Sequence, residues 1–295
     1  MLHESLGLDA GGLDHRPPFL DLGPLQRAEC LRGLLRGWEN VLAELGEARP
    51  HSRLGQGRRD GGIELADDIL GRAFRCPQGM PVIDDPMSMI RCTNKVFLME
   101  LLGQNQVATP PTVMLPENSD LHKVIDELGL PLVVKIPDGS FSRGIHKVST
   151  MEEFKRITDE LFEETDLLLA QKFLPTEFDW RVGVLSGEPL FVCQYRMARG
   201  HWQIVKHRPD GSSHEGGFRT FELDKAPREL IDIAVRAARP IGEGFYGVDI
   251  KETERGFIVM EVNDNPNLEH GIEDQVGKDE IWTRLLKWFI ERFEQ

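Results

Sequence analysis

Two short segments near the C-terminus, Phe245–Lys251 and Phe257–Asn263, are rich in β-forming residues and are separated by a short polar run. This pattern predicts a β-hairpin. If the hairpin folds about Arg255, Asp249 lies directly opposite Glu261, because both are equally far from Arg255 along the chain. The other face is then apolar, as a half-buried hairpin requires. Its expected residues are Val248, Ile250, Ile258, Met260 and Val262.

The polar face of this hairpin predicts a metal site. Two neighbouring carboxylates repel each other unless a cation or a proton lies between them, and Asn263, two residues beyond Glu261, points to the same face. Oxygen ligands of this kind suit Mg²⁺, which takes few protein carboxylates and completes its shell with water and phosphate. A solvated polar face is the alternative, but the Asp264–Asn267 turn adds further oxygen-bearing side chains and favours the metal site.

The composition argues against several classes of function. The chain of 295 residues has a net charge of −14, whereas a general nucleic-acid binder holds phosphate with clustered Lys and Arg. Its four cysteines are widely spaced without a C-x-x-C pair, which indicates neither a zinc site nor a disulfide framework. No segment has the length of a transmembrane helix, and the N-terminus lacks the apolar core of a signal peptide. We therefore expect a cytoplasmic protein that binds neither nucleic acid nor membrane.

The organisation of the chain changes near residue 80. Residues 1–79 form an irregular N-terminal region, in which only Leu25–Leu45 has a helical period of apolar residues. From residue 80 to residue 295 helices alternate with strands, and one stretch is rich in strands, which predicts an α+β domain. The expected helices are Asn94–Leu102, Leu121–Leu128, Met151–Phe162, Pro227–Ile241 and Ile281–Phe293. The expected extended segments are Pro81–Pro86, Pro110–Leu115, Leu132–Ile136 and several strands between Leu167 and Phe221.

A lysine inside an apolar strand is the next candidate for chemistry. Lys135 lies within Leu132–Ile136, and a buried lysine is costly unless it meets an anion. A lysine that reaches solvent from the strand end is the alternative. The following loop, Asp138–Ile145, can lay backbone N–H groups over phosphates and close as a lid, although it matches neither G-x-G-x-x-G nor a P-loop. Its candidate phosphate-contacting residues are Gly139, Ser140, Ser142 and Gly144.

Two further stretches carry groups suited to a nucleotide. Leu167–Pro175 is an apolar strand that leaves into a linker, which suits an adenine ring, although by itself it fits an ordinary core strand better. Arg181 and Arg196 project from neighbouring strands and suit the charge that develops on a transferring phosphate. Surface ion pairs would explain both arginines equally well.

In chain order the motifs are Thr93–Lys95, Val133–Lys135, Ala170–Leu174, Asp179–Arg181, Gly247–Ile250 and Met260–Pro266. This order resembles the ATP-grasp superfamily and, within it, the RimK-like carboxylate–amine ligases. The similarity runs from about Met80 to the C-terminus. The resemblance implies an ATP-grasp fold, in which two α+β subdomains clasp ATP, preceded here by a shortened or irregular N-terminal region.

The resemblance also implies a role for each candidate. Lys95 and Lys135 would hold the phosphates of ATP, and Asp179 would lie near the ribose. Arg181 and Arg196 would steady the transferring phosphoryl group and the acyl phosphate that it forms. The residues implied to line the adenine are Gln171, Lys172, Phe173 and Leu174. The residues implied to bind Mg²⁺ or Mn²⁺, as a pair of ions, are Asp249, Glu261 and Asn263.

The activity implied is ATP-dependent ligation of a small-molecule carboxylate to an amine, with amino acids or peptides as substrates. The carboxylate would form an acyl phosphate, and the amine would then displace phosphate to give an amide, leaving ADP. The alternatives are a kinase that phosphorylates a hydroxyl and a nucleotide-binding scaffold without turnover. Intact Lys135, Asp249, Glu261 and Asn263 argue against the scaffold. A homo-oligomer is compatible with the sequence.

Two positions depart from the relatives. Lys172 stands where many of them carry Glu, which is tolerable where adenine is held mostly by backbone groups. Glu215 stands where the ribosomal-protein glutamate ligases often have Arg before a Gly-Gly pair. The resemblance therefore does not extend to the amino-acid substrate of those ligases.

Overall fold

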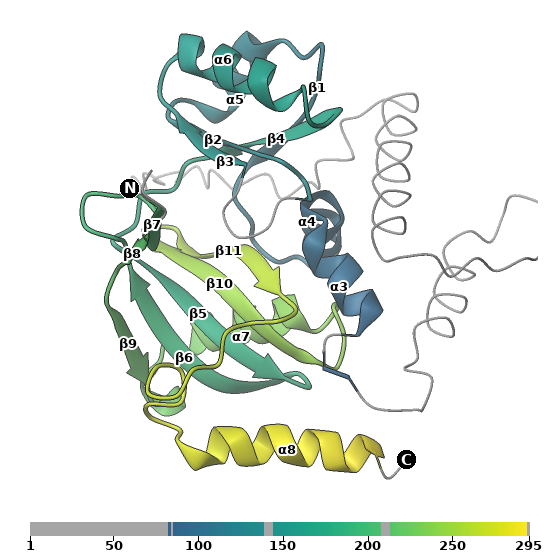
Figure 1. Cartoon of the computed structure of the whole chain (residues 1–295), viewed down its shortest axis with the longest axis vertical. Helices are drawn as coiled ribbons and strands as arrows, with labels where there is room; N and C mark the ends of the chain where they lie inside the picture. Colours follow the sequence, from purple (N-terminus) through teal and green to yellow (C-terminus); the bar gives the residue numbers. More distant parts are fainter. Residues whose placement is uncertain (1–81, 84, 139–143, 208–212, 294–295) are drawn as a thin grey trace, which may run out of the picture.

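The computed structural model of the chain describes residues 82–83, 85–138, 144–207 and 213–293 (Figure 1). The irregular region expected over residues 1–79, with its helix Leu25–Leu45, lies outside them. The described residues form helices and antiparallel sheets, which confirms the predicted α+β class. Within these ranges no helix is both long enough and apolar enough to cross a membrane.

The smaller subdomain consists of strands β1 (Thr112–Pro116), β2 (Leu132–Lys135), β3 (Ile145–Val148) and β4 (Leu167–Lys172) with helices α5 (Leu121–Leu128) and α6 (Met151–Leu161). Its strands are antiparallel in the order β1-β4-β2-β3, and the two helices cover one face of the sheet (Figure 1). Asp120 and Thr150 begin the helices, because each side chain accepts a hydrogen bond from a backbone N–H of the first turn. Buried Val134, Phe154 and Leu168 fill the space between sheet and helices.

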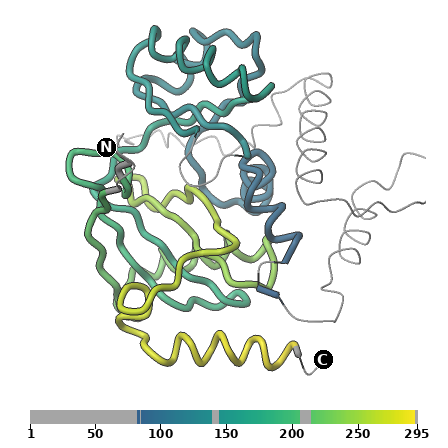
Figure 2. The backbone as a smooth tube through the Cα atoms, in the orientation of Figure 1, coloured from purple at the N-terminus to yellow at the C-terminus, as the bar shows by residue number. Residues whose placement is uncertain are grey.

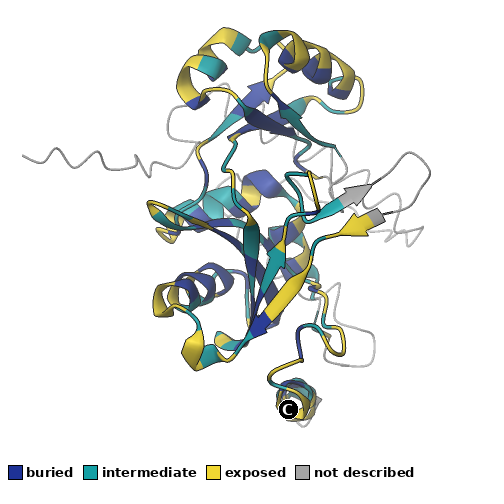
Figure 3. Cartoon of the chain, turned by 90° about the vertical axis from the view of Figure 1, so that its left-hand side faces the viewer, coloured by how far each residue is buried: buried dark blue, intermediate teal, exposed yellow. Residues whose placement is uncertain are grey.

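The larger sheet consists of β5 (Phe178–Leu185), β6 (Glu188–Arg196), β9 (Phe218–Phe221), β10 (Phe245–Thr253) and β11 (Gly256–Asn263), in the order β11-β10-β5-β6-β9. It is accompanied by helices α7 (Arg228–Ala238) and α8 (Asp279–Phe293), the 3₁₀ turn η1 (Leu223–Lys225) and the hairpin of β7 (Val205–His207) and β8 (Ser213–Glu215). The two helices pack on opposite faces, since Val192 joins the core under α7 and its neighbour Cys193 joins the core under α8. The strands are mainly buried, whereas the outward surfaces of the helices are exposed (Figure 3).

Two consecutive helices, α3 (Pro86–Thr93) and α4 (Lys95–Gln104), connect the halves of the molecule (Figure 2). Helix α4 packs against both sheets. Val96 contacts Met114 and Leu169 of the smaller sheet, while Leu98 and Leu102 belong to the core of the larger sheet. Lys95, the first residue of α4, is therefore placed between the two sheets.

The strand expected at Pro81–Pro86 was predicted wrongly. Pro86 begins α3 instead, and the Asp85 carboxylate accepts hydrogen bonds from the backbone N–H groups of Met87 (3.0 Å) and Ser88 (3.1 Å). Proline suits the first position of a helix, because its missing N–H would have no partner there. The Asp-Pro pair is thus a helix start. The other expected helices from residue 94 onward are present, with ends within three residues of those predicted.

The predicted hairpin is present as β10 and β11, but a β-bulge interrupts its register. From the turn, Thr253 pairs with Gly256 and Ile250 pairs with Val259. The next pair along is Asp249 with Glu261, so one residue of β11 is left over. The carboxylates face each other as predicted, although the turn alone would not bring them together.

The bulge also corrects the predicted apolar face. The extra residue is Met260, and beyond it the alternation of side chains is shifted by one position. Val259, which the prediction omitted, is fully buried with Val262 in the core under α7. Ile258 pairs with Lys251 and so belongs to the opposite face. The prediction was therefore wrong for Ile258 and Met260 and right for the other three positions.

Candidate functional site

Asp249 lies at the centre of a group of charged side chains on one face of the larger sheet. It pairs with Glu261 on one side and with Arg181 on the other. The Nε and Nη2 atoms of Arg181 donate to Oδ1 and Oδ2 of Asp249 at 2.7 and 2.9 Å. Asn263 Nδ2 donates to Oδ2 at 3.1 Å. The structure thus brings together Asp249, Glu261, Asn263 and Arg181, as the sequence predicted.

A glycine allows the segment after β11 to approach this group. A Cβ atom on Gly247 would lie 2.6 Å from Cβ of Pro266, which is closer than real Cβ contacts. Gly247 also pairs with Asn263, and its carbonyl oxygen accepts a hydrogen bond from Asn263 Nδ2 at 3.3 Å. The absence of a side chain at Gly247 therefore fixes where Asn263 and the following turn lie.

Glu261 faces an ammonium group from the junction between the sheets. The Nζ atom of Lys95 lies 3.9 Å from Oε1 of Glu261. Burial raises the pKa of the Glu261 carboxyl, Lys95 opposes this rise and Asp249 adds to it. Lys95 is 8% exposed, and its backbone N–H donates to the carbonyl oxygen of Pro137 at 3.1 Å. The carboxylate pair is thus in an environment where a further cation would be stabilising.

Lys135 projects from the end of β2 toward the same region. Its Nζ atom donates to Oε1 of Gln171 at 2.7 Å, and Nε2 of Gln171 donates to the Thr112 hydroxyl at 3.0 Å. Burial lowers the pKa of Lys135 to about 8; Glu261 opposes this shift and Lys95 adds to it. An ammonium that donates to a neutral amide oxygen in a buried site is suited to an incoming anion.

Asp179 is engaged by a lysine that the sequence interpretation missed. Nζ of Lys251 lies 2.5 Å from Oδ1 of Asp179 and 2.7 Å from the Thr176 hydroxyl, and Lys251 is 8% exposed. Burial raises the pKa of Asp179, and Lys251 opposes the shift. Lys251 follows Asp249 by two residues on β10, so strand alternation places both on one face. That spacing was the signal by which Lys251 could have been found.

The residues expected around adenine lie on and after the end of β4. Gln171 is buried, Lys172 is exposed, and Leu174 is half-buried. Phe173 lies under Nζ of Lys147, 3.8 Å from the ring centroid, and makes an edge-to-face contact with Trp202 at 6.0 Å. Neither Lys147 nor Trp202 was a sequence candidate, because each comes from a distant part of the chain.

One predicted residue, Arg196, is not brought to the carboxylates, and three others cannot be placed relative to them. Arg196, on β6, is exposed and pairs with Phe178 of β5. Arg181, on β5, pairs with Cys193, which precedes Arg196 by three residues on β6. An odd spacing along a strand puts two side chains on opposite faces, so the expected convergence of Arg181 and Arg196 is wrong. In the loop after β2, Gly139, Ser140 and Ser142 lie outside the described residues.

Gly144 closes that loop against β2. Its φ is +66°, a left-handed conformation that favours glycine, and a Cβ atom there would lie 2.8 Å from Cδ1 of Ile136. Its carbonyl oxygen accepts from the Ile136 N–H at 3.2 Å. At the other end of the loop, Asn94 Nδ2 donates to Oδ1 of Asp138 at 2.6 Å, which ties the loop to the start of α4.

The donor set fits an ion that is shared with phosphate. Among the described residues, no group of three or more His, Cys, Asp or Glu side chains is arranged around a common point. Two carboxylates and an amide remain, Asp249, Glu261 and Asn263, and Mg²⁺ takes few carboxylates and keeps water and phosphate as its other ligands. A closed, all-protein metal cage does not fit this site.

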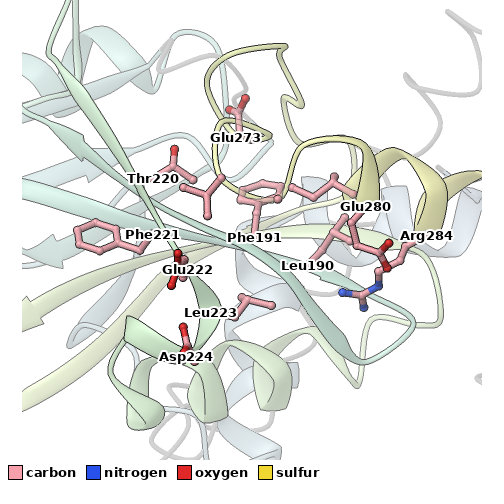
Figure 4. A pocket seen from close by; sticks show the side chains of 13 residues that line it. Leu190, Phe191, Thr220, Phe221, Glu222, Leu223, Asp224, Glu273, Glu280 and Arg284 are labelled. Carbon is pink, nitrogen blue, oxygen red and sulfur yellow. The ribbon is translucent and has the colours of Figure 1, made fainter.

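Two hollows in the described part of the molecule differ in which residues line them. One is lined from both sheets, by Lys95, Lys135, Gln171 and Glu261 among others. A larger one, of about 380 Å³, lies between β9 and α8 and has apolar walls that include Leu190, Phe191 and Leu223 (Figure 4). Residues predicted from sequence for the nucleotide or the metal line the first hollow and not the second.

Comparison with known proteins identifies the family of the chain. The family model of the RimK-like ATP-grasp domain matches residues 92–289. The chain is 27% identical to the alpha-aminoadipate–LysW ligase LysX of Saccharolobus solfataricus over 66% of this chain and 69% of that protein. It is 30% identical to a probable alpha-L-glutamate ligase of Citrobacter koseri over 71% of this chain and 67% of that protein.

A ribosomal protein bS6–L-glutamate ligase of Shigella boydii is 29% identical over 72% of this chain and 67% of its own length. Among solved structures, the D-alanine–D-alanine ligase of Bacillus anthracis complexed with ATP superposes with a TM-score of 0.59. That match has 18% identity and covers 80% of this chain and 78% of the other. At this identity the likeness shows a shared fold.

Proposed function

The chain belongs to the RimK-like ATP-grasp family, and on this premise we propose that it uses ATP to join a small-molecule carboxylate to an amine. The products would be an amide, ADP and phosphate. We assign this activity to residues 80–295, with residues 1–79 as a separate N-terminal region. We further propose amino acids or peptides as the substrates, since the relatives named above are ligases of amino acids.

The observation that carries the proposal is that Glu261, which pairs with Asp249, lines one hollow together with Lys95 and Lys135. A nucleotide triphosphate with its metal ion presents positive charge to carboxylates and negative charge to ammonium groups. The larger sheet supplies the carboxylates, while α4 and β2 supply Lys95 and Lys135 from the other side. This separation of charge suits a bound metal–triphosphate better than it suits a solvated surface.

The residues divide the work of the reaction. In our proposal Lys95 and Lys135 hold phosphate oxygens, and Arg181 stabilises the charge on the transferring phosphoryl group. Asp249, Glu261 and Asn263 would hold Mg²⁺, which would neutralise part of the charge on the phosphates. The substrate carboxylate attacks the γ-phosphorus and ADP leaves; the amine then attacks the acyl carbon and phosphate leaves. Positioning and charge neutralisation account for catalysis, without a nucleophilic side chain.

A screen for ADP release tests this proposal directly. Amino acids and dipeptides are supplied in pairs, one as carboxylate and one as amine, with ATP and Mg²⁺, and active pairs are repeated with hydroxylamine replacing the amine. A ligase gives a hydroxamate, because hydroxylamine captures an acyl phosphate. A kinase releases ADP and leaves a stable phosphate ester without hydroxamate. Nucleotide binding without ADP release across the screen would indicate a scaffold and contradict the proposal.

A further inference from the structure

Arg181 is held on two sides. Its guanidinium donates two hydrogen bonds to Asp249, and its Cζ atom lies 5.4 Å from the centroid of the Tyr195 ring. The adjacent Asp249 carboxylate raises the pKa of Arg181 above its usual range, so the guanidinium stays charged. A cation near an aromatic face is attracted by the ring quadrupole. The position of the Tyr195 ring therefore influences the position of Arg181.

Tyr195 is itself fixed by a buried carboxylate. Its hydroxyl donates to Oε1 of Glu273, and Oε2 of Glu273 accepts from the backbone N–H of Glu269 at 2.7 Å. Glu273 is 1% exposed. Burial, and then the hydrogen bond to Glu273, raises the pKa of the Tyr195 hydroxyl well above its usual value, so it remains a donor. The bond joins β6 to the segment that follows Asn263.

A second bond attaches the same segment to the sheet without touching Tyr195. The Thr220 hydroxyl donates to the carbonyl oxygen of Ile272 at 2.6 Å. Figure 4 shows Thr220 and Glu273 near one another at one end of the hollow between β9 and α8. Loss of either bond loosens the same segment. The bond to Glu273 leads through the Tyr195 ring to the Arg181 guanidinium, whereas the Thr220 hydroxyl lies 3.1 Å from Sγ of Cys193.

A buried carboxylate whose donors are neutral needs a nearby positive charge. The donors to Glu273 named above are a phenol and a backbone amide, and the nearby positive charge is the Arg181 guanidinium on the ring of that phenol. We propose that Glu273 is a positioning residue that fixes Arg181 through Tyr195. This inference rests on the proposed function, because it gives Arg181 a second support when Asp249 turns to a metal ion.

Without that support, the guanidinium that orients Asp249 would be held on one side only. Asp249 accepts from Arg181 through both oxygens, so the position of the guanidinium sets the orientation of the lone pairs that a metal ion would use. Tyr195 and Glu273 offer the guanidinium an aromatic face and a negative charge at its other side. The link thus holds the Asp249 carboxylate, through Arg181, in the orientation that an incoming metal ion would meet.

The test compares Tyr195→Phe and Glu273→Gln with Thr220→Val as the matched control. Tyr195→Phe keeps the ring, Glu273→Gln keeps the shape, and Thr220→Val removes the other bond of the same segment. The first readout is Mn²⁺ affinity by electron paramagnetic resonance with a non-hydrolysable ATP analogue, which requires no turnover. We expect both link variants to weaken Mn²⁺ binding roughly 10- to 100-fold, as outer-shell changes at metal sites do, and Thr220→Val to bind as wild type.

The second readout is non-additivity. In an Arg181→Lys background, Tyr195→Phe and Glu273→Gln should cause no further loss of Mn²⁺ affinity, because the group on which they act is already altered. Additive losses, or an equal loss in Thr220→Val, would overturn the positioning role and leave a structural one. A melting temperature for each variant shows whether it is folded. If Tyr195→Phe is not folded, the comparison is made with Glu273→Gln alone. If wild type binds Mn²⁺ and nucleotide but ligates no pair, the proposed function fails while this comparison still decides the role of Glu273.

Discussion

Asp249 and Glu261 face each other across β10 and β11 only because Met260 is bulged out of the ladder between them. From the turn outward the paired residues of the hairpin keep a constant register, and that register alone would set Asp249 opposite Met260. The extra residue shifts β11 by one place and brings the second carboxylate into line. Bulges that re-aim a side chain next to a functional site are a recurrent device of antiparallel sheets.

The carboxylate pair gives the first prediction. Glu261→Gln should abolish ADP release while the protein stays folded, because a neutral amide cannot replace a carboxylate that a metal ion requires. ADP release and circular dichroism measure the two properties. Glu254→Gln is the matched control, since Glu254 is exposed in the turn of the same hairpin and should keep full activity. Wild-type turnover in Glu261→Gln, or in excess chelator, would rule out the metal assignment.

Lys135 gives the second prediction. Lys135→Met should weaken binding of a non-hydrolysable ATP analogue by roughly 10- to 100-fold, the range expected when a hydrogen bond to a charged group is lost. Isothermal titration calorimetry measures the affinity. Lys123→Met, which alters a lysine whose side chain is 83% exposed on α5, should bind the analogue as wild type. A lower melting temperature with unchanged affinity would make Lys135 a structural lysine.

The pH dependence of stability is the third prediction. Burial lowers the pKa of Lys135 from 10.5 to about 8 in the folded protein. Between these two values the unfolded chain binds a proton that the folded protein has released, so this group makes the free energy of unfolding rise with pH. Lys135→Met removes the group and with it this contribution. The stability advantage of Lys135→Met over wild type should therefore be largest below pH 8 and shrink toward pH 10.5.

Urea unfolding at several pH values between 7 and 10.5 measures this difference. The same series for Lys123→Met supplies the baseline, because an exposed lysine is not desolvated on folding. A stability difference between Lys135→Met and wild type that stays constant with pH would show that the Lys135 ammonium is not destabilised by burial.

Gly247 gives the fourth prediction. Gly247→Ala should destabilise the protein by about 1–3 kcal/mol, the usual effect of an added carbon in a packed site, because the new Cβ would lie 2.6 Å from Pro266. The displaced Asn263–Pro266 segment should also weaken Mn²⁺ binding. Gly217→Ala is the control, since a Cβ there meets no atom within 4 Å. Equal unfolding free energies for the two variants would contradict the packing argument.

Features that depend on residues close together in the sequence could be predicted, whereas features that depend on distant residues could not. Helix α5 was placed to the residue because its apolar period is local, and the other helices expected from residue 94 onward were placed to within three residues. The carboxylate pair was predicted from strand alternation, and Lys251 was readable from the same alternation. The bulge at Met260 was not predictable, since it depends on how β10 and β11 fit within the sheet. The contact of Tyr195 with Glu273 joins residues 78 positions apart, so no local sequence pattern predicts it.

Helix α4 has a consequence for how the two halves can move. Val96 is anchored in the smaller half, and Leu98 and Leu102 are anchored in the larger one, within three turns of the same rod. If the two halves moved apart, α4 would lose its apolar contacts with one of them. Lys95 would then move with the half that kept its contacts with α4. The distance from Lys95 Nζ to Glu261 Oε1, 3.9 Å here, therefore reports how closely the two halves approach each other. Two spin labels, one on the surface of each half, would measure how far the halves approach each other.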